Sequence, residues 1–138
     1  MGIELNHLIV PAGDKWRSAR FVVDILGLAS ASEWGPFVQV RTSNGVTLDF
    51  AENPHLPHQH YAFLVTETEF DAALVRVRAA GIEFYADFNF TGRGEINHLY
   101  GGRGFYFHDL DGHALELITR PYGAMPEMWT PTQPPNRE

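Results

Sequence analysis

Hydrophobic and polar residues alternate along several short stretches of this sequence. A period of two residues is typical of strands that bury one face. The pattern predicts strands at residues 3–10, 37–42, 46–51, 60–65, 82–87, 104–108 and 114–119, with a further strand region beginning at Leu28. Segments rich in Gly, Pro, Asn and Asp predict turns between them at residues 11–14, 34–36, 43–45 and 111–112.

Two other segments carry apolar residues at helical spacing. Before the first, Asp14 can accept hydrogen bonds as an N-cap, and Gly27 is suited to the left-handed conformation that ends a helix. Before the second, Thr66 and Glu69 have the spacing of a capping box, and Gly81 ends the helix. The predicted buried stripes are Trp16, Ala19, Val23 and Leu26 in the first helix and Phe70, Leu74 and Val77 in the second.

The order of these elements occurs twice. His7 precedes the first helix-ending glycine by 20 residues, and His60 precedes the second by 21. Each half consists of a strand, a helix and three strands, so we predict an α+β fold of two βαβββ modules, at about residues 3–52 and 60–120, within one domain. The Pro-rich tail, residues 121–138, cannot hold a helix or a central strand and is predicted to be extended or disordered.

Charge and composition narrow the function classes. Ten basic residues are scattered among 17 acidic ones, for a formal net charge of -7, which disfavours a nucleic acid partner. The sequence has no run of eighteen apolar residues and does not begin with a basic segment followed by an apolar one. We therefore expect a cytoplasmic protein without a membrane segment. Because there is no cysteine, thiolate ligands are excluded, and the seven histidines and the carboxylates are the available metal ligands.

The repeat places four polar side chains at matching positions. Aligning the two halves sets His7 opposite His60, and the strands that close each half set Asp49 opposite Glu116. Two imidazoles and a carboxylate form a common ligand set for a catalytic divalent metal, and they leave coordination positions free for substrate oxygens. We predict that His7, His60 and Glu116 bind such a metal, with Asp49 as a possible fourth ligand.

Three segments carry a family resemblance: residues 6–10, 60–65 and 109–116, each of which contains one of the predicted ligands. With the paired modules, they resemble the vicinal oxygen chelate superfamily, which includes glyoxalase I, bleomycin- and fosfomycin-resistance proteins, methylmalonyl-CoA epimerase and extradiol dioxygenases. The resemblance covers residues 3 to about 120. It implies that the modules form a cupped mixed sheet around the metal ion, that the substrate is a small molecule with vicinal oxygens, and that the protein is a homodimer.

The segment before Glu116 resembles the extradiol ring-cleavage signature. His98, Tyr106, Asp109 and Gly112 match that signature in order and spacing, and Leu110 stands where it has Pro. The resemblance implies a catalytic role for His98 as a hydrogen-bonding group near the metal and for Tyr106 as a partner of a substrate hydroxyl or of oxygen. It also favours Fe(II) as the metal. Because this match is specific, we favour a ring-cleaving dioxygenase.

Two alternatives remain open. In a glyoxalase-like lyase or isomerase, all four repeat-related positions would bind Ni, Zn, Co or Mn, and Asp49 or Glu116 would act as the base. Asp49 is one methylene shorter than the Glu usual in glyoxalases. A non-catalytic drug-binding protein, resembling the bleomycin-resistance members, would suit the negative charge and the three Trp residues. That alternative predicts no metal requirement.

Three further residues are candidates for substrate binding. Phe37 and Tyr100 can line an aromatic wall, although aromatic residues on strands are more often core residues. Arg103 lies in a Gly-rich loop and can pair with an anionic substrate, although such a loop is as often simply solvated. His113 follows a turn glycine and is interpreted as a hairpin residue that faces away from Glu116.

Overall fold

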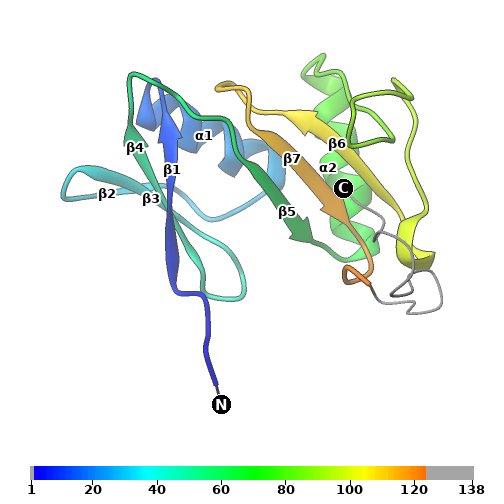
Figure 1. Cartoon of the computed structure of the whole chain (residues 1–138), viewed down its shortest axis with the longest axis horizontal. Coiled ribbons are helices and arrows are strands. Elements are labelled where there is room, and N and C mark those ends of the chain that lie inside the picture. Colours follow the sequence, from blue (N-terminus) through cyan, green and yellow to red (C-terminus); the bar gives the residue numbers. More distant parts are fainter. Residues whose placement is uncertain (1, 124–138) are drawn as a thin grey trace, which may run out of the picture. The chain divides into compact units, whose positions relative to one another are not determined.

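The computed structural model describes residues 2–123 and contains the predicted repeat of elements (Figure 1). The first half contains β1 (His7–Ala12), α1 (Lys15–Leu26), β2 (Ser32–Trp34), β3 (Phe37–Arg41) and β4 (Thr47–Glu52). The second contains β5 (His60–Leu64), α2 (Glu67–Ala79), the 3-10 turn η1 (Leu99–Gly101), β6 (Gly104–His108) and β7 (Ala114–Ile118). Two small mixed sheets with two helices confirm the predicted fold class. Most of the predicted Pro-rich tail lies outside the described residues.

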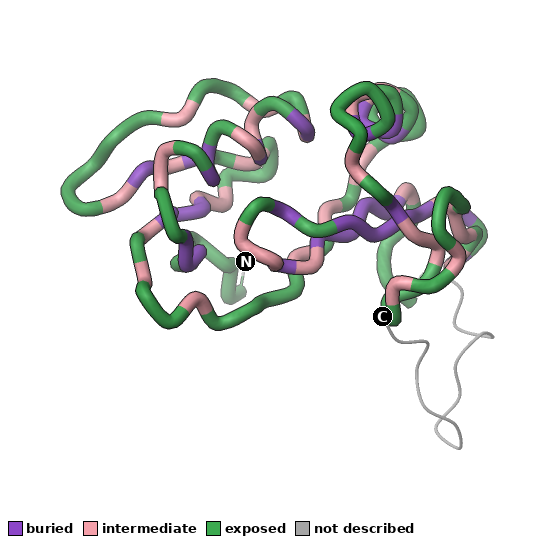
Figure 2. Tube along the Cα trace, turned by 90° about the horizontal axis from the view of Figure 1, so that it is seen from above, coloured by how far each residue is buried: buried purple, intermediate pink, exposed green. Residues whose placement is uncertain are grey.

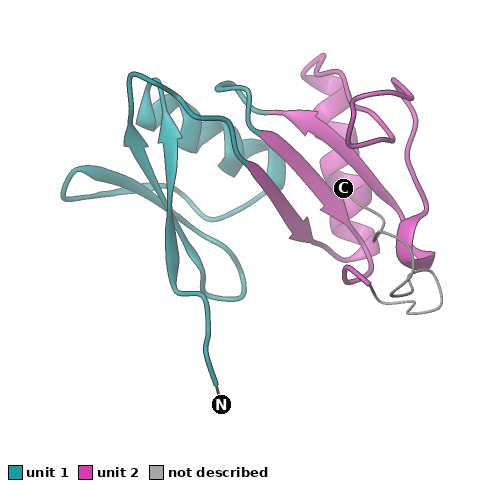
Figure 3. Ribbon diagram, viewed as in Figure 1, with its two compact units in different colours: residues 1–59, 109–113 teal, residues 60–108, 114–138 magenta. Residues whose placement is uncertain are grey.

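The chain forms two compact units (Figure 3). The first contains residues 1–59 together with residues 109–113, the short loop between β6 and β7. The second contains residues 60–108 and 114–123 of the described chain. Neither α1 nor α2 is long and apolar enough to cross a membrane.

The sheet of the first unit has the strand order β1-β4-β3-β2. β1 runs parallel to β4, whereas β3 is antiparallel to both β4 and β2. The register places Asp49 beside Ile9 on one side and Gln39 on the other, so these side chains share a face with His7. The opposite face packs against α1 and carries buried apolar residues: Val10, Val38, Val40, Leu48 and Phe50.

Helix α1 begins and ends as predicted, but its buried face differs from the prediction. Asp14 accepts a hydrogen bond from the backbone of Arg17, and Gly27 has a φ of 72°. The buried residues are Ser18, Ala19, Val22 and Ile25, so the stripe is rotated by about one residue from the predicted one. The rotated face includes the polar Ser18, which is buried and whose hydroxyl donates to the Asp111 carboxylate.

Several predicted strand boundaries are wrong. β1 begins at His7 and not at residue 3, and β2 begins at Ser32 and not at Leu28. β1 continues through Pro11, where a break was predicted, because β1 is an edge strand and a proline at an edge removes no ladder hydrogen bond. The strand predicted at 82–87 is reduced to Tyr85, which forms isolated bridges with Tyr106 and Arg93. The chain after Tyr85 turns back on itself, with the Phe90 amide bonded to the Asp87 carbonyl, and so cannot continue the strand.

The sheet of the second unit has the strand order β5-β7-β6. α2 begins at Thr66 with the predicted capping box, and its predicted stripe residues are all buried: Phe70, Leu74 and Val77. Phe70 packs on Phe105 of β6, with 5.2 Å between ring centroids. Buried positions accordingly recur along α2 and the strands it covers (Figure 2). The opposite sheet face bears the candidate site.

Candidate functional site

The candidate site is centred on Glu116 in the middle of β7. Its side chain is 2% exposed, and its Oε1 lies 3.0 Å from Nε2 of His60 at the start of β5. The parallel register pairs Glu116 with Ala62 and His60 with Ala114, so both polar side chains occupy the same sheet face. The neighbours on this face, Ala62 and Ala114, are small and allow the imidazole and the carboxylate to meet directly.

Burial controls the ionisation of Glu116. Loss of solvent raises the pKa of its carboxyl above the usual value, and the hydrogen bond with His60 and the neighbouring Tyr106 side chain counteract part of that rise. A carboxylate in such a place gains more from a bound cation than an exposed one does, because little water competes for it. One carboxylate and one imidazole are donors that suit a divalent metal of the Fe, Mn, Co, Ni or Zn group. The predicted set includes a second imidazole, that of His7.

Tyr106 adjoins this pair. It is directly opposite Glu116 in the antiparallel register of β6 and β7 and is 1% exposed. Its ring centroid lies 6.0 Å from that of His60, and its side chain, on the same sheet face as Glu116, helps to lower the pKa of that carboxyl. The structure therefore brings together three of the residues predicted from the sequence: His60, Glu116 and Tyr106.

The other two repeat-related residues belong to the first unit. His7 is exposed at the start of β1, where its Nδ1 lies 2.7 Å from the side-chain oxygen of Asn6. Asp49 is 5% exposed and accepts a hydrogen bond of 2.9 Å from Gln39. Both side chains occupy the face of their sheet that is not covered by α1. Their roles as third ligand and as base stay predictions.

The remaining predicted residues have differing surroundings. His98 is exposed and precedes η1. Tyr100 is 3% exposed within η1, has a φ of 60° and lies 5.3 Å from the Tyr122 ring. Phe37 is half-buried at the start of β3, opposite Trp34. Tyr100 therefore has the burial of a core residue, and the substrate-binding roles stay predictions.

Arg103 is held by carboxylates of α2. Its guanidinium lies 2.7 Å from Glu67 and 2.9 Å from Asp71 and rests over the ring of Phe70, 4.3 Å from its centroid. Its hydrogen bond also lowers the pKa of the Glu67 carboxyl. The guanidinium thus already has two acidic partners, which fix the loop before β6 to the start of α2. An anionic substrate would have to compete with them.

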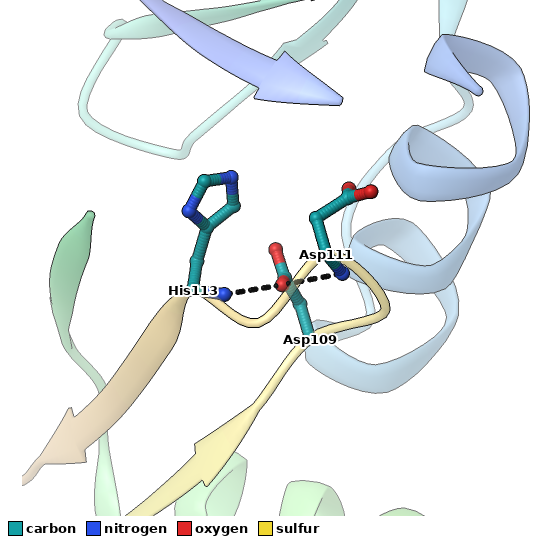
Figure 4. Close-up of side chains that lie close together, drawn as sticks. All are labelled: Asp109, Asp111 and His113. Carbon is teal, nitrogen blue, oxygen red and sulfur yellow. Dashed lines mark hydrogen bonds between the residues drawn. The ribbon is translucent and has the colours of Figure 1, made fainter. Parts of the chain in front are cut away.

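A second group of possible ligands lies in the loop between β6 and β7. Donor atoms of Asp109, Asp111 and His113 all lie within 4.8 Å of one another. In Figure 4 the Asp109 carboxylate lies between the backbone nitrogens of the other two residues, at 2.9 Å from Asp111 and 2.8 Å from His113. Asp111 also accepts from the Gly13 amide and the Ser18 hydroxyl. These bonds account for the group as a folded Asp turn that anchors the loop to the first unit.

His113 is the centre of this anchor. It is fully buried, its Nδ1 accepts from the Gln59 amide at 3.0 Å, and its Nε2 donates to the Pro11 carbonyl at 2.7 Å. Accepting at one nitrogen and donating at the other requires the neutral ring with its hydrogen on Nε2. Sequence reasoning identified a hairpin histidine but missed this anchoring role, since the partners are 54 and 102 residues away in the chain.

Sequence reasoning also missed two residues near Tyr106. His108 follows it by two positions on β6 and therefore shares its sheet face, a placement that strand alternation could have indicated. Phe90 stacks on His108, with 3.9 Å between ring centroids and 14° between ring planes. No spacing signal in the sequence links Phe90 to β6.

Known proteins resemble this chain over most of its length. The family model of the Glyoxalase/Bleomycin resistance protein/Dioxygenase superfamily matches residues 4–117. Glutathione transferase FosA of Serratia marcescens is 32% identical over 120 residues, covering 82% of this chain and 78% of FosA.

Solved structures give the same assignment. Oxidase ChaP-H2 has a TM-score of 0.87 and 51% identity, over 90% of this chain and 98% of that one. The fosfomycin resistance protein FosX from Listeria monocytogenes has a TM-score of 0.64 and 22% identity, covering 93% of this chain and 98% of FosX, and thus shares the fold. The match over residues 4–117 and the paired modules together show that this chain belongs to the Glyoxalase/Bleomycin resistance protein/Dioxygenase superfamily.

Proposed function

We propose that this protein is a divalent-metal-dependent enzyme that oxidises a small substrate with neighbouring oxygen atoms, by ring cleavage of the extradiol type. The observation that carries the proposal is the buried Glu116 carboxylate in contact with His60 and Tyr106 on one sheet face. Half of the residues are identical to those of a protein named as an oxidase, which supports oxidative chemistry over the lyase and drug-binding alternatives.

In this proposal His60 and Glu116 hold the metal, and His7 supplies the second imidazole. When bound, Fe(II) would supply Lewis acidity toward two adjacent substrate oxygens and electrons for the reaction with dioxygen. Tyr106 favours the ionised form of the Glu116 carboxyl, against the effect of burial. It is also proposed as the partner of a substrate hydroxyl or of bound oxygen. His98 is proposed to hydrogen-bond the substrate from the loop before η1.

The test begins with metal content after anaerobic purification. We expect near-stoichiometric iron in the wild-type protein and its loss in His60→Ala and Glu116→Ala. The matched control is His55→Ala, since His55 is an exposed histidine of the connector before β5. Oxygen consumption with a panel of catechols then tests the chemistry. Bound metal without oxygen consumption would contradict the dioxygenase assignment, and a wild-type protein that binds no metal after reconstitution would contradict the enzyme assignment.

Thiol addition is a second candidate function. It is favoured by the 32% identity to a glutathione transferase over 82% of this chain. The same His60 and Glu116 would hold the metal, and the substrate would be an electrophile with an oxygen substituent. Loss of free glutathione in the presence of small epoxides, dependent on Mn(II) and abolished in Glu116→Ala, would support this function over the oxidative one.

We further expect the active protein to be a homodimer. β1 and β5 are the edge strands of their respective sheets, and within residues 2–123 each pairs on one side only. Exposed strand edges are commonly covered by further chain or by a partner. Light scattering on the purified protein tests this expectation, and a monomeric mass would contradict it.

A further inference from the structure

An aromatic cluster of the second unit lies on the same sheet face as Glu116. The antiparallel register places Tyr106 opposite Glu116 and His108 opposite Ala114, and Ala114 also pairs with His60 on its other side. His60 and His108 are therefore in one register row across three strands, adjacent to the row that contains Glu116 and Tyr106. His108 is the exposed residue at the end of β6.

Phe90 covers one side of the His108 ring. The two rings are nearly parallel, at 14°, with 3.9 Å between centroids. Phe90 also contacts Tyr106 and Tyr85 edge-on, at centroid distances of 6.3 and 5.3 Å. Tyr85 itself is bridged to Tyr106 through two backbone hydrogen bonds of 2.8 Å, which extend the sheet beyond β6. Three aromatic side chains thus fix the position of Phe90.

The backbone of Phe90 is strained in this position. Its φ is 60°, a left-handed conformation that is unfavourable for a side chain of this size. A tight turn maintains it: the Phe90 amide donates to the Asp87 carbonyl at 2.8 Å, and the Ala86 amide donates to the Gly92 carbonyl at 3.1 Å. Figure 1 shows this loop beside β6. Strained residues of this kind are found preferentially where a side chain is held for function.

We propose that His108 contacts the substrate and that Phe90 is the residue that positions it. On this proposal His108 donates or accepts a hydrogen bond at a hydroxyl of a flat aromatic substrate, while the half-buried Phe90 ring borders the substrate ring. The imidazole cannot turn freely because one of its faces is stacked on Phe90. The assignment rests on the proposed function, since it names the residues that would select a hydroxylated ring for the site of His60 and Glu116.

The test measures ligand binding rather than turnover. The ligand 4-nitrocatechol is titrated into zinc-loaded and metal-free protein and followed by its absorption, with nitrobenzene as the matched ligand that lacks hydroxyls and is followed by calorimetry. The variants are His108→Leu, His108→Gln and Phe90→Leu. Phe88→Leu, in the same turn, and His55→Leu, in the connector, are the controls. Zinc affinity is measured for every variant.

We expect His108→Leu to weaken 4-nitrocatechol binding about tenfold, the loss of one hydrogen bond, with unchanged zinc affinity. His108→Gln should restore part of the affinity because an amide can make the same bond, and Phe90→Leu should weaken binding although His108 is present. Nitrobenzene binding should not respond to His108→Leu. A merely structural role for the stack would lower the affinities for zinc and for both ligands together.

The outcomes separate this inference from the proposed function. Unchanged 4-nitrocatechol affinity in both His108→Leu and Phe90→Leu would overturn the inference while leaving the metal site intact. A protein that binds no zinc, yet binds 4-nitrocatechol in a manner that depends on His108, would overturn the proposed function and support the inference. Absence of 4-nitrocatechol binding to the wild-type protein in both forms would overturn the inference outright.

Discussion

Replacing the buried imidazole of His113 should destabilise the protein substantially. His113→Phe keeps a planar ring of similar size but removes both ring nitrogens. The change therefore leaves two backbone groups without their partner, the Gln59 amide and the Pro11 carbonyl. His113→Leu removes the same two bonds with a differently shaped side chain, so agreement between the two variants separates hydrogen bonding from packing.

The expected loss follows from the burial of each bond. The bond to Pro11 is buried, and an orphaned buried acceptor costs about 1–3 kcal/mol. The bond to Gln59 is only partly buried, so water can replace it and its loss costs about 1 kcal/mol. The free energy of unfolding should therefore fall by about 2–4 kcal/mol, which for a chain of this length lowers the melting temperature by about 6–16 °C.

Differential scanning calorimetry of the metal-free variants provides the measurement. His55→Phe is the control, because His55 is an exposed histidine in the connector before β5, which also contains Gln59. The melting temperature of this variant should equal that of the wild-type protein. If both His113 variants melted at the wild-type temperature, the two bonds would contribute nothing, and the interpretation of residues 109–113 as an anchor would be refuted.

Three further changes test other parts of the structure. Burial raises the pKa of Glu116 in the folded state above its usual 4.5, so the folded state binds this proton more tightly than the unfolded state does. The stability of the metal-free protein should therefore fall as pH rises from the unfolded-state pKa through the folded-state pKa. Glu116→Gln should remove that dependence and melt at a higher temperature than the wild type at neutral pH, measured by calorimetry with a chelator. Arg103→Gln should lower the free energy of unfolding in urea by no more than about 1 kcal/mol, since its ion pairs are partly solvated, whereas Arg93→Gln, at a side chain 71% exposed, should leave it unchanged. Gly27→Ala should cost about 1 kcal/mol in the same assay, because φ is 72° at this helix end, and a wild-type value would contradict the left-handed cap.

Local patterns in the sequence predicted most of the fold. Strand alternation, the Thr66 capping box and the helix-ending Gly27 depend on residues close together in the chain, and each is present as expected. The rotated stripe of α1 could not be predicted, because it includes a polar residue, Ser18, whose hydrogen-bond partner Asp111 lies 93 residues later. The strand missing after Tyr85 likewise depends on how the following loop turns back.

The part of the candidate site on β5 and β7 was predictable, because the internal repeat and the regular alternation of the strands both indicated it. His60 and Glu116 share a sheet face because both strands alternate regularly, and their direct contact follows from that register. Tyr106 was identified through a signature and is adjacent to them. The anchoring bonds of His113 and the stack of Phe90 on His108 join segments without any sequence periodicity, so only the three-dimensional structure reveals them.

The placement of residues 109–113 within the first unit has a consequence for how the chain folds. The Gly13 amide and the Pro11 carbonyl find their partners 98 and 102 residues later, so the first unit cannot complete its hydrogen bonds until nearly the whole described chain has been synthesised. Contacts of such sequence separation slow folding because a long loop must close first. A polypeptide cut at the repeat boundary, after residue 59, would retain a complete βαβββ pattern and still lack part of its own structure.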